Sequence, residues 1–115
     1  FDNIHLPPLG YISEPEPVGP GGHVYAVTNK AFPGWVKVGK SQSPDIRLIG
    51  YQTSDPHRDY QMPYKRLFSD RSAAESEAHK RLKSITDEWE GEWFKIDLNT
   101  VQNVILDIWS EIDYA

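Results

Sequence analysis

The stretch "HVYAVTNKAFPGWVKVGKS", residues 23–41, decides the fold because it contains two strand-like runs and a turn between them. Residues 23–28 and 35–39 are rich in β-branched and apolar side chains, and the segment between them contains Asn, Pro and Gly. This pattern predicts a β-hairpin. Side chains alternate between the two faces of a strand, so that Tyr25 and Lys37 can share one face of the hairpin.

The same stretch also matches the phosphate-loop pattern G-x-x-x-x-G-K-[ST] at residues 34–41. A phosphate loop needs a flexible segment between a buried strand and a helix that begins at the Lys-Ser pair. Here the four intervening residues, Trp-Val-Lys-Val, favour a strand. Pro44 places the start of the next helix after the Lys-Ser pair. A P-loop nucleotide binder is therefore a lesser alternative to the hairpin.

Helical and extended segments alternate along the rest of the chain. Ser43 and Pro44 are suited to the start of a helix, and Asp70 is suited to cap a second one. Pro63 lacks the N–H that a central strand needs, so its segment is expected at a sheet edge. The elements predicted after the hairpin are a helix over 44–53, an edge strand over 60–69, a helix over 71–85, a strand over 92–96 and an amphipathic helix that starts at Asn99 or Thr100.

These elements predict a small α/β protein, in which a central antiparallel or mixed sheet of three to four strands is flanked by about three helices. Five prolines within residues 1–21 predict an extended linker or arm. We expect the main domain over residues 22–98. The apolar stripe of residues 99–115 predicts a C-terminal helix that packs on this domain.

Composition narrows the class of protein. A chain of 115 residues without cysteine allows one domain with a modest core and no disulfide framework. No apolar run is long enough to span a membrane, and no signal peptide is visible. We therefore expect an intracellular protein, cytoplasmic if it is bacterial or phage-encoded and nuclear if it is eukaryotic. Because the sequence begins with Phe1, we also expect further domains of a longer polypeptide.

The net charge of −5 argues against a generally basic nucleic-acid binder. However, residues 22–98 contain all 12 Lys and Arg residues and 11 of the 17 acidic residues, so the formal charge of this segment is +1. A segment that is close to neutral can hold a local basic cleft. DNA therefore remains a possible partner.

Polar residues on the two predicted helices recur at spacings that place them together. Arg47 and Tyr51 are i, i+4 neighbours on the first helix. Glu75 and His79 have the same spacing on the second helix, where Glu75 borders the apolar stripe that includes Leu82. A carboxylate at the border of an apolar face needs a cationic partner or a metal.

Five short motifs follow one another along the chain: "HVY" at 23–25, "KVG" at 37–39, Arg47, Glu75 in a predicted helix and "EWF" at 92–94. This ordered set resembles the GIY-YIG nuclease superfamily, with the first two motifs standing where GIY and YIG stand. Lysine in place of the second motif tyrosine resembles the phage-type branch of the superfamily.

The resemblance covers about residues 22–97 and implies a GIY-YIG-like fold. It also implies a metal-dependent DNA endonuclease, which hydrolyses a phosphodiester bond with one divalent cation, Mg²⁺ or Mn²⁺. DNA is then the implied partner of the chain.

The resemblance also implies roles for individual residues. Glu75 would be the carboxylate that binds the cation, and Arg47 would bind the scissile phosphate. Tyr25 would hydrogen-bond the attacking water or act as its base, and Lys37 is the rival base. Tyr51 matches a tyrosine or histidine that the superfamily often places one turn beyond the arginine.

Four further positions complete the candidate site. His79 would contact the leaving group or a phosphate, and Lys40 would support DNA binding from the end of the hairpin. His57 and Arg58 lie in a polar loop from which they would touch the DNA backbone. An ordinary solvated loop is the alternative for His57 and Arg58. Each candidate side chain alone also fits a structural role, whereas Tyr25, Lys37, Arg47 and Glu75 together in family order favour function.

The chain departs from the family pattern at two places. His23 replaces the first glycine of GIY, and the late asparagine of many members has no clear counterpart. The corresponding region carries four acidic residues, which could bind metal but would also repel phosphate: Asp87, Glu88, Glu90 and Glu92. A second hypothesis is therefore a catalytically weak module of the same fold that binds DNA or protein.

Overall fold

The hairpin expected from residues 23–41 forms the centre of the fold. The computed structural model describes residues 19–114, so residues 1–18 of the expected arm lie outside the described part. Strand β1 (Gly22–Asn29) pairs antiparallel with β2 (Trp35–Ser41), and Tyr25 lies opposite Gly39. The two strands therefore present Tyr25 and Lys37 on the same face, as the alternation predicts.

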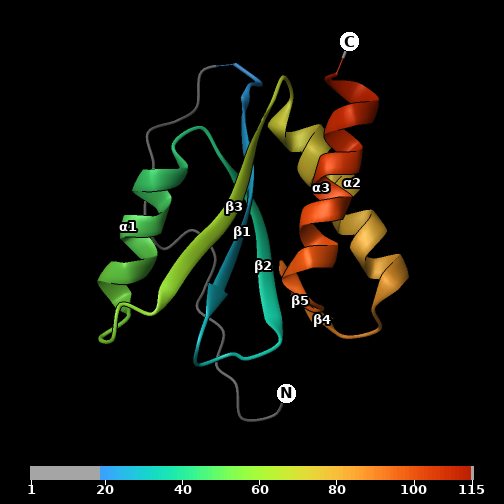
Figure 1. Ribbon diagram of the computed structural model, residues 1–115. Helices are drawn as coiled ribbons and strands as arrows, with labels where there is room; N and C mark the ends of the chain where they lie inside the picture. The colour runs from blue at the N-terminus through green and yellow to red at the C-terminus, as the bar shows by residue number, and fades with distance from the viewer. Residues whose placement is uncertain (1–18, 115) are drawn as a thin grey trace.

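Three more strands complete an antiparallel sheet in the order β3-β1-β2-β5-β4 (Figure 1). β3 (Tyr60–Phe68) pairs with the free side of β1, and β5 (Trp93–Lys95) pairs with the first half of β2. The two-residue strand β4 (Trp89–Glu90) pairs with β5. The predicted α/β class is confirmed, and the sheet is slightly larger than expected because β4 is too short to show alternation.

Three helices cover the two faces of the sheet (Figure 1). α1 (Pro44–Ser54) lies on one face, and α2 (Arg71–Ile85) and α3 (Leu98–Ile112) lie on the other. Since β2 and β3 are both antiparallel to β1, they run in the same direction. α1 therefore connects two parallel strands across the strand that separates them.

The helix starts confirm part of the sequence prediction and correct the rest. Asp70 caps α2 as expected, because its side chain accepts a hydrogen bond from the Ala73 amide. Ser43 occupies the cap position of α1 but makes no capping bond with its side chain. α3 begins at Leu98 rather than at Asn99 or Thr100, since Asp97 caps it by accepting from the Thr100 amide at 2.9 Å.

The chain at residues 34–41 does not form a phosphate loop. Residues 35–41 are the strand β2, and the following helix begins only at Pro44. The Lys40-Ser41 pair therefore lies within a strand rather than at a helix N-terminus, and the nucleotide-binding alternative is wrong for this stretch.

β3 is an edge strand, as Pro63 predicts. Its pairing with β1 shifts in register between Ala26 and Thr28, whose partners are Tyr64 and Gln61. Pro63 lies at this irregularity, where the missing N–H breaks no regular ladder bond.

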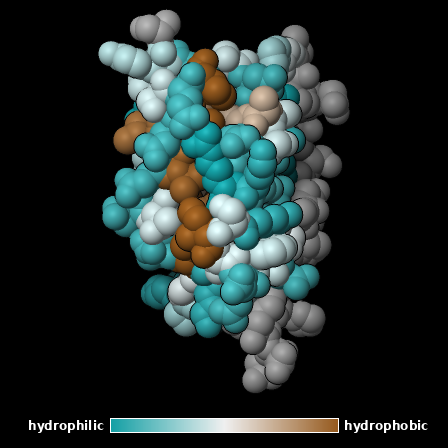
Figure 2. Space-filling view, turned by 90° about the vertical axis from the view of Figure 1, so that its right-hand side faces the viewer, coloured by the Kyte–Doolittle hydropathy of each residue, from teal (hydrophilic) through white to brown (hydrophobic). Residues whose placement is uncertain are grey.

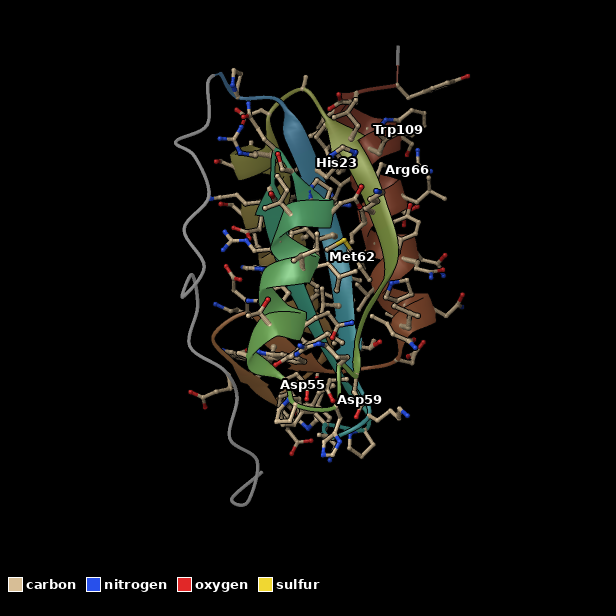
Figure 3. The ribbon with its side chains drawn as sticks, turned by 90° about the vertical axis from the view of Figure 1, so that its left-hand side faces the viewer. His23, Asp55, Asp59, Met62, Arg66 and Trp109 are labelled. Carbon is tan, nitrogen blue, oxygen red and sulfur yellow. The ribbon has the colours of Figure 1, made fainter. Side chains whose placement is uncertain are left out.

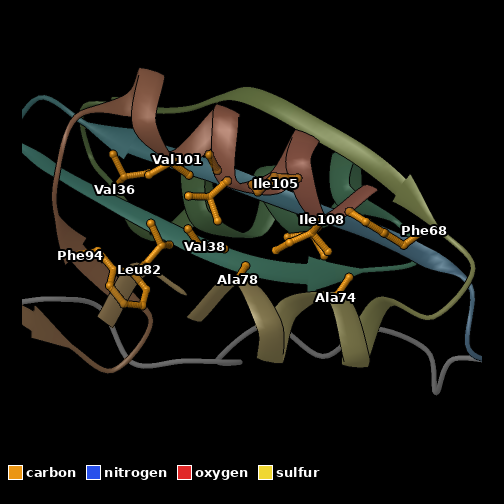
Figure 4. Close-up of a cluster of buried hydrophobic side chains, with 13 residues drawn as sticks. Val36, Val38, Phe68, Ala74, Ala78, Leu82, Phe94, Val101, Ile105 and Ile108 are labelled. Carbon is orange, nitrogen blue, oxygen red and sulfur yellow. The ribbon is translucent and has the colours of Figure 1, made fainter. Parts of the chain in front are cut away.

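Two apolar clusters hold the layers together. The larger one fills the space between the sheet and the α2–α3 pair, where Val38, Ala78 and Ile105 are fully buried (Figure 4). The smaller cluster lies under α1 and is mostly aromatic: Tyr25, Val27, Trp35, Tyr51, Tyr60 and Trp93. The aromatic cluster brings polar atoms into the interior, and these atoms need partners.

Surface ion pairs link the two helices of the other layer. The Arg81 guanidinium donates to Glu77 on its own helix at 2.8 Å and to Glu111 on α3 at 2.7 Å. Figure 2 faces this helical side, where apolar side chains form a narrow band between larger hydrophilic areas. Among residues 19–114, none of the helices combines the length and apolar character that a bilayer span requires.

The approach of Tyr25 to Gly39 leads to a stability prediction. A Cβ atom added at Gly39 would lie 2.6 Å from the Tyr25 hydroxyl oxygen and 2.8 Å from its Cζ atom. Gly39→Ala is therefore expected to lower the free energy of unfolding by about 1–3 kcal/mol, measured by urea denaturation.

Gly21→Ala is the control for this prediction, because its new Cβ would meet no atom closer than 3.8 Å. An equal loss of stability in both variants would show that the cost is a general effect of glycine replacement and would contradict the proposed contact.

Candidate functional site

The candidate site forms where β5 stops pairing with β2. The ladder ends at Lys37, which pairs with Trp93, and the Val38 amide still donates to the Glu92 carbonyl at 2.9 Å. The Val38 carbonyl accepts instead from the His79 ring nitrogen Nε2 on α2, at 2.7 Å. Side chains of α2 therefore reach the edge of β2 beyond the end of β5.

A pocket of about 230 Å³ lies at this edge. Its lining comes from both faces of the sheet, because α1 contributes from one side and α2 from the other. The lining residues are Tyr25, Lys37, Lys40, Arg47, Tyr51, Glu75 and Glu92. The structure thus brings together six side chains that the sequence singled out, and it adds Glu92.

Two tyrosines form the floor of the pocket. The hydroxyls of Tyr25 and Tyr51 lie 3.2 Å apart and are buried. Burial, followed by the neighbouring Tyr51, raises the pKa of Tyr25 well above its ordinary value. The Tyr25 hydroxyl therefore keeps its proton and can donate a hydrogen bond.

Lys37 is a buried charge whose amine contacts a carboxylate. Its residue is only 1% exposed, and its amine donates to Oε1 of Glu92 at 2.8 Å. Burial lowers the pKa of Lys37, and the adjacent Glu92 carboxylate opposes this effect. The amine also lies 5.8 Å from the centroid of the Tyr51 ring.

Glu75 is a buried carboxylate at the other side of the pocket. The Lys40 amine lies 3.5 Å from Oε1 of Glu75, and the Lys40 side chain is partly exposed to solvent. Burial, followed by repulsion from Glu92, raises the pKa of Glu75 to about 7, although Lys40 partly offsets this rise. Lys40 is therefore the cationic partner that a carboxylate at the border of an apolar stripe requires.

Three side chains of the site could hold a metal ion. Ligand atoms of Glu75, His79 and Glu92 all lie within 4.8 Å of one another. Carboxylate oxygens and a neutral imidazole nitrogen are common metal ligands. Burial lowers the pKa of His79, which favours the neutral ring. The donor set therefore fits the divalent cation that the sequence resemblance implies.

Arg47 reaches the pocket from α1, one turn before Tyr51. The two side chains have the i, i+4 spacing that the sequence showed, and both line the pocket. An arginine that lines a pocket together with two carboxylates and two lysines can bind a phosphate beside a cation.

His57 and Arg58 do not line the pocket. They lie in the turn after α1, where the Arg58 guanidinium donates to the backbone carbonyls of Gln52 and Asp55. Asp55 and Asp59 flank this turn at the lower end of α1 in Figure 3, whereas His23 lies at the upper end of the sheet. The contact of His57 and Arg58 with DNA stays a prediction.

Sequence reasoning did not single out Glu92 from the acidic residues at 87–92. The other three, Asp87, Glu88 and Glu90, are exposed and outside the pocket. Gly91 is the sequence feature that could have singled out Glu92. It has φ 58° and forms with Glu92 the tight turn between β4 and β5. This turn directs Glu92 towards β2.

Comparison with known proteins identifies the family. The model of the T5orf172 domain matches residues 22–109, which is most of the chain. The chain therefore belongs to the T5orf172 domain family, a phage-associated domain linked to nuclease-like folds. No curated protein and no solved structure matches the chain.

The Lys37–Glu92 pair leads to a second prediction. Glu92→Gln leaves a buried amine without its carboxylate and is expected to lower the free energy of unfolding by on the order of 2–4 kcal/mol. Adding Lys37→Met removes the stranded charge and should recover most of this loss in urea denaturation. The exposed Glu90→Gln serves as a control, with a change within about 0.5 kcal/mol. Additive losses in the double variant would contradict the coupling.

The raised pKa of Glu75 leads to a third prediction, for protein in EDTA. A carboxyl group with a pKa of about 7 when folded and about 4.3 when unfolded stabilises the fold fully below about pH 4 and loses this contribution as the pH rises through about 7. Glu75→Gln cannot ionise. Its unfolding free energy relative to the unsubstituted protein should therefore rise between about pH 5 and about pH 8. A constant or falling difference would contradict the raised pKa.

Proposed function

We propose that this domain is a metal-dependent DNA endonuclease that hydrolyses a phosphodiester bond with one divalent cation. One observation carries the proposal: Tyr25, Lys37, Arg47 and Glu75 come from four different elements and line one pocket. These four side chains supply the cation ligand, the phosphate-binding fork and the proton-transfer groups that phosphodiester hydrolysis requires.

The charge and position of each side chain suggest its role in this reaction. Glu75 would hold the cation, with His79 and Glu92 as nearby donors. A cation bound there would offset negative charge on the leaving oxygen. Arg47 would hold the scissile phosphate, and Lys40 would contact a neighbouring phosphate from the end of β2.

The choice of base follows from the two perturbed pKa values. Tyr25 holds its proton strongly, so it is suited to orient the attacking water by a hydrogen bond. The lowered pKa of Lys37 makes its neutral amine easier to form. We therefore propose Lys37 as the base and Tyr25, with Tyr51 behind it, as the positioning pair.

A second candidate function is a binding module of the same fold for DNA or protein. The observation that favours it is the 2.8 Å ion pair of Lys37 with Glu92, which favours the charged form of the amine that would act as base. Such a module would bind its partner without hydrolysis.

Nicking of supercoiled plasmid in Mg²⁺ or Mn²⁺ tests the proposal. Arg47→Ala and Glu75→Gln are each expected to reduce the nicking rate by at least about 100-fold, because each removes stabilisation of the transition state. EDTA should abolish nicking. Glu77→Gln lies on the same helix as Glu75 but pairs with Arg81 outside the pocket, so its rate should stay unchanged.

The outcomes separate the two candidates. Equal nicking by Arg47→Ala, Glu75→Gln and the unsubstituted protein would mean a contaminating nuclease and would contradict the proposal. DNA binding without nicking, measured by fluorescence anisotropy, would instead support the binding module.

A further inference from the structure

Three potential metal ligands converge beside the pocket from two segments of the chain. Glu75 and His79 are one turn apart on the same face of α2, and Glu92 comes from the turn between β4 and β5. Their ligand atoms lie within 4.8 Å of one another. A nuclease cation held by Glu75 would therefore have two further protein donors at hand, one of which is a nitrogen.

His79 is held in an orientation that is typical of a metal-binding histidine. A backbone carbonyl can only accept hydrogen bonds, so the 2.7 Å contact with the Val38 carbonyl assigns the proton to Nε2. In the neutral ring the lone pair then lies on Nδ1. The ring also packs against Phe94, with centroids 5.3 Å apart. Metal-binding histidines commonly donate their second nitrogen to a carbonyl in this way.

We propose that Glu75, His79 and Glu92 form a three-ligand site, which prefers first-row transition-metal dications to Mg²⁺. Mg²⁺ favours an all-oxygen shell rich in water and is usually bound by one or two carboxylates. An imidazole ligand shifts the preference towards Co²⁺, Ni²⁺ and Zn²⁺, whose affinities for mixed nitrogen and oxygen sites exceed that of Mn²⁺.

The neighbouring lysines are compatible with this site. Lys40 has a side chain that is 39% exposed and lies 3.5 Å from Glu75, so it can move into solvent when a cation binds. Lys37 is buried and stays on Oε1 of Glu92, because the carboxylate has a second oxygen for a cation. The two lysines also partly offset the charge of the paired carboxylates when no cation is bound.

The inference concerns the cation of the proposed nuclease and rests on that proposal, but its test measures metal binding rather than cleavage. The metal-free protein is titrated with Mg²⁺, Mn²⁺ and Co²⁺ by calorimetry. Co²⁺ is expected to bind at least about tenfold more tightly than Mg²⁺. His79→Gln should weaken Co²⁺ binding by about 10–100-fold and change Mg²⁺ binding by less than about threefold.

Two matched variants test whether the effects belong to this site. His57→Gln removes an exposed imidazole outside the pocket, and Glu90→Gln removes an exposed carboxylate two residues from Glu92. Both should keep the Co²⁺ affinity of the unsubstituted protein, whereas Glu92→Gln should weaken it. Equal affinities for Co²⁺ and Mg²⁺, or an unchanged preference in His79→Gln, would overturn the inference.

A measurement on the unsubstituted protein covers the case in which a variant fails to fold. Long-range ¹H–¹⁵N NMR spectra distinguish the two ring nitrogens of each of the four histidines. Adding Zn²⁺ should move the Nδ1 resonance of His79 and leave its Nε2 protonated. A His79 resonance that does not respond to Zn²⁺ would overturn the inference. Plasmid nicking by the unsubstituted protein in Mg²⁺, combined with equal Co²⁺ and Mg²⁺ affinities, would overturn the inference and leave the proposed function intact.

Discussion

The contact between the Lys37 amine and the Glu92 carboxylate is the interaction on which the site depends. Lys37 lies in the middle of the sheet, where a charge without a partner would cost several kcal/mol. The partner arrives from 55 residues later, in the turn that leads into β5. Because β5 pairs with β2 only as far as Lys37, the segment that neutralises the amine also leaves the rest of the β2 edge open. The pocket occupies this open edge.

Much of the fold follows from relations between neighbours in the sequence. The alternation of the hairpin places Tyr25 beside Lys37, the Asp70 side chain caps α2, and Pro63 marks an edge strand. Features that depend on only one or two residues were harder to predict from the sequence. β4 is too short for alternation, and the start of α3 depends on which of several polar side chains reaches the free amides; Asp97 does so.

Some residues of the site could likewise be predicted from local sequence, and others could not. Helical spacing brought out Arg47 with Tyr51, and the position of Glu75 beside an apolar stripe indicated a buried carboxylate. The importance of Glu92 could not be derived from local sequence, because the acids at 87–92 look alike until the turn at Gly91 orients them. Loop composition suggested DNA contacts for Arg58, and these stay a prediction; in the structure its guanidinium donates to carbonyls at the end of α1.

The edges of the sheet have a consequence for how this domain behaves among other chains. An exposed edge strand offers free amides and carbonyls to any extended segment, which is a common route to aggregation. Here Pro63 and the register shift interrupt one edge, and the other edge ends in the two residues of β4. Within residues 19–114, both outer strands are therefore irregular or short, which disfavours the pairing of a foreign strand with either end of the sheet.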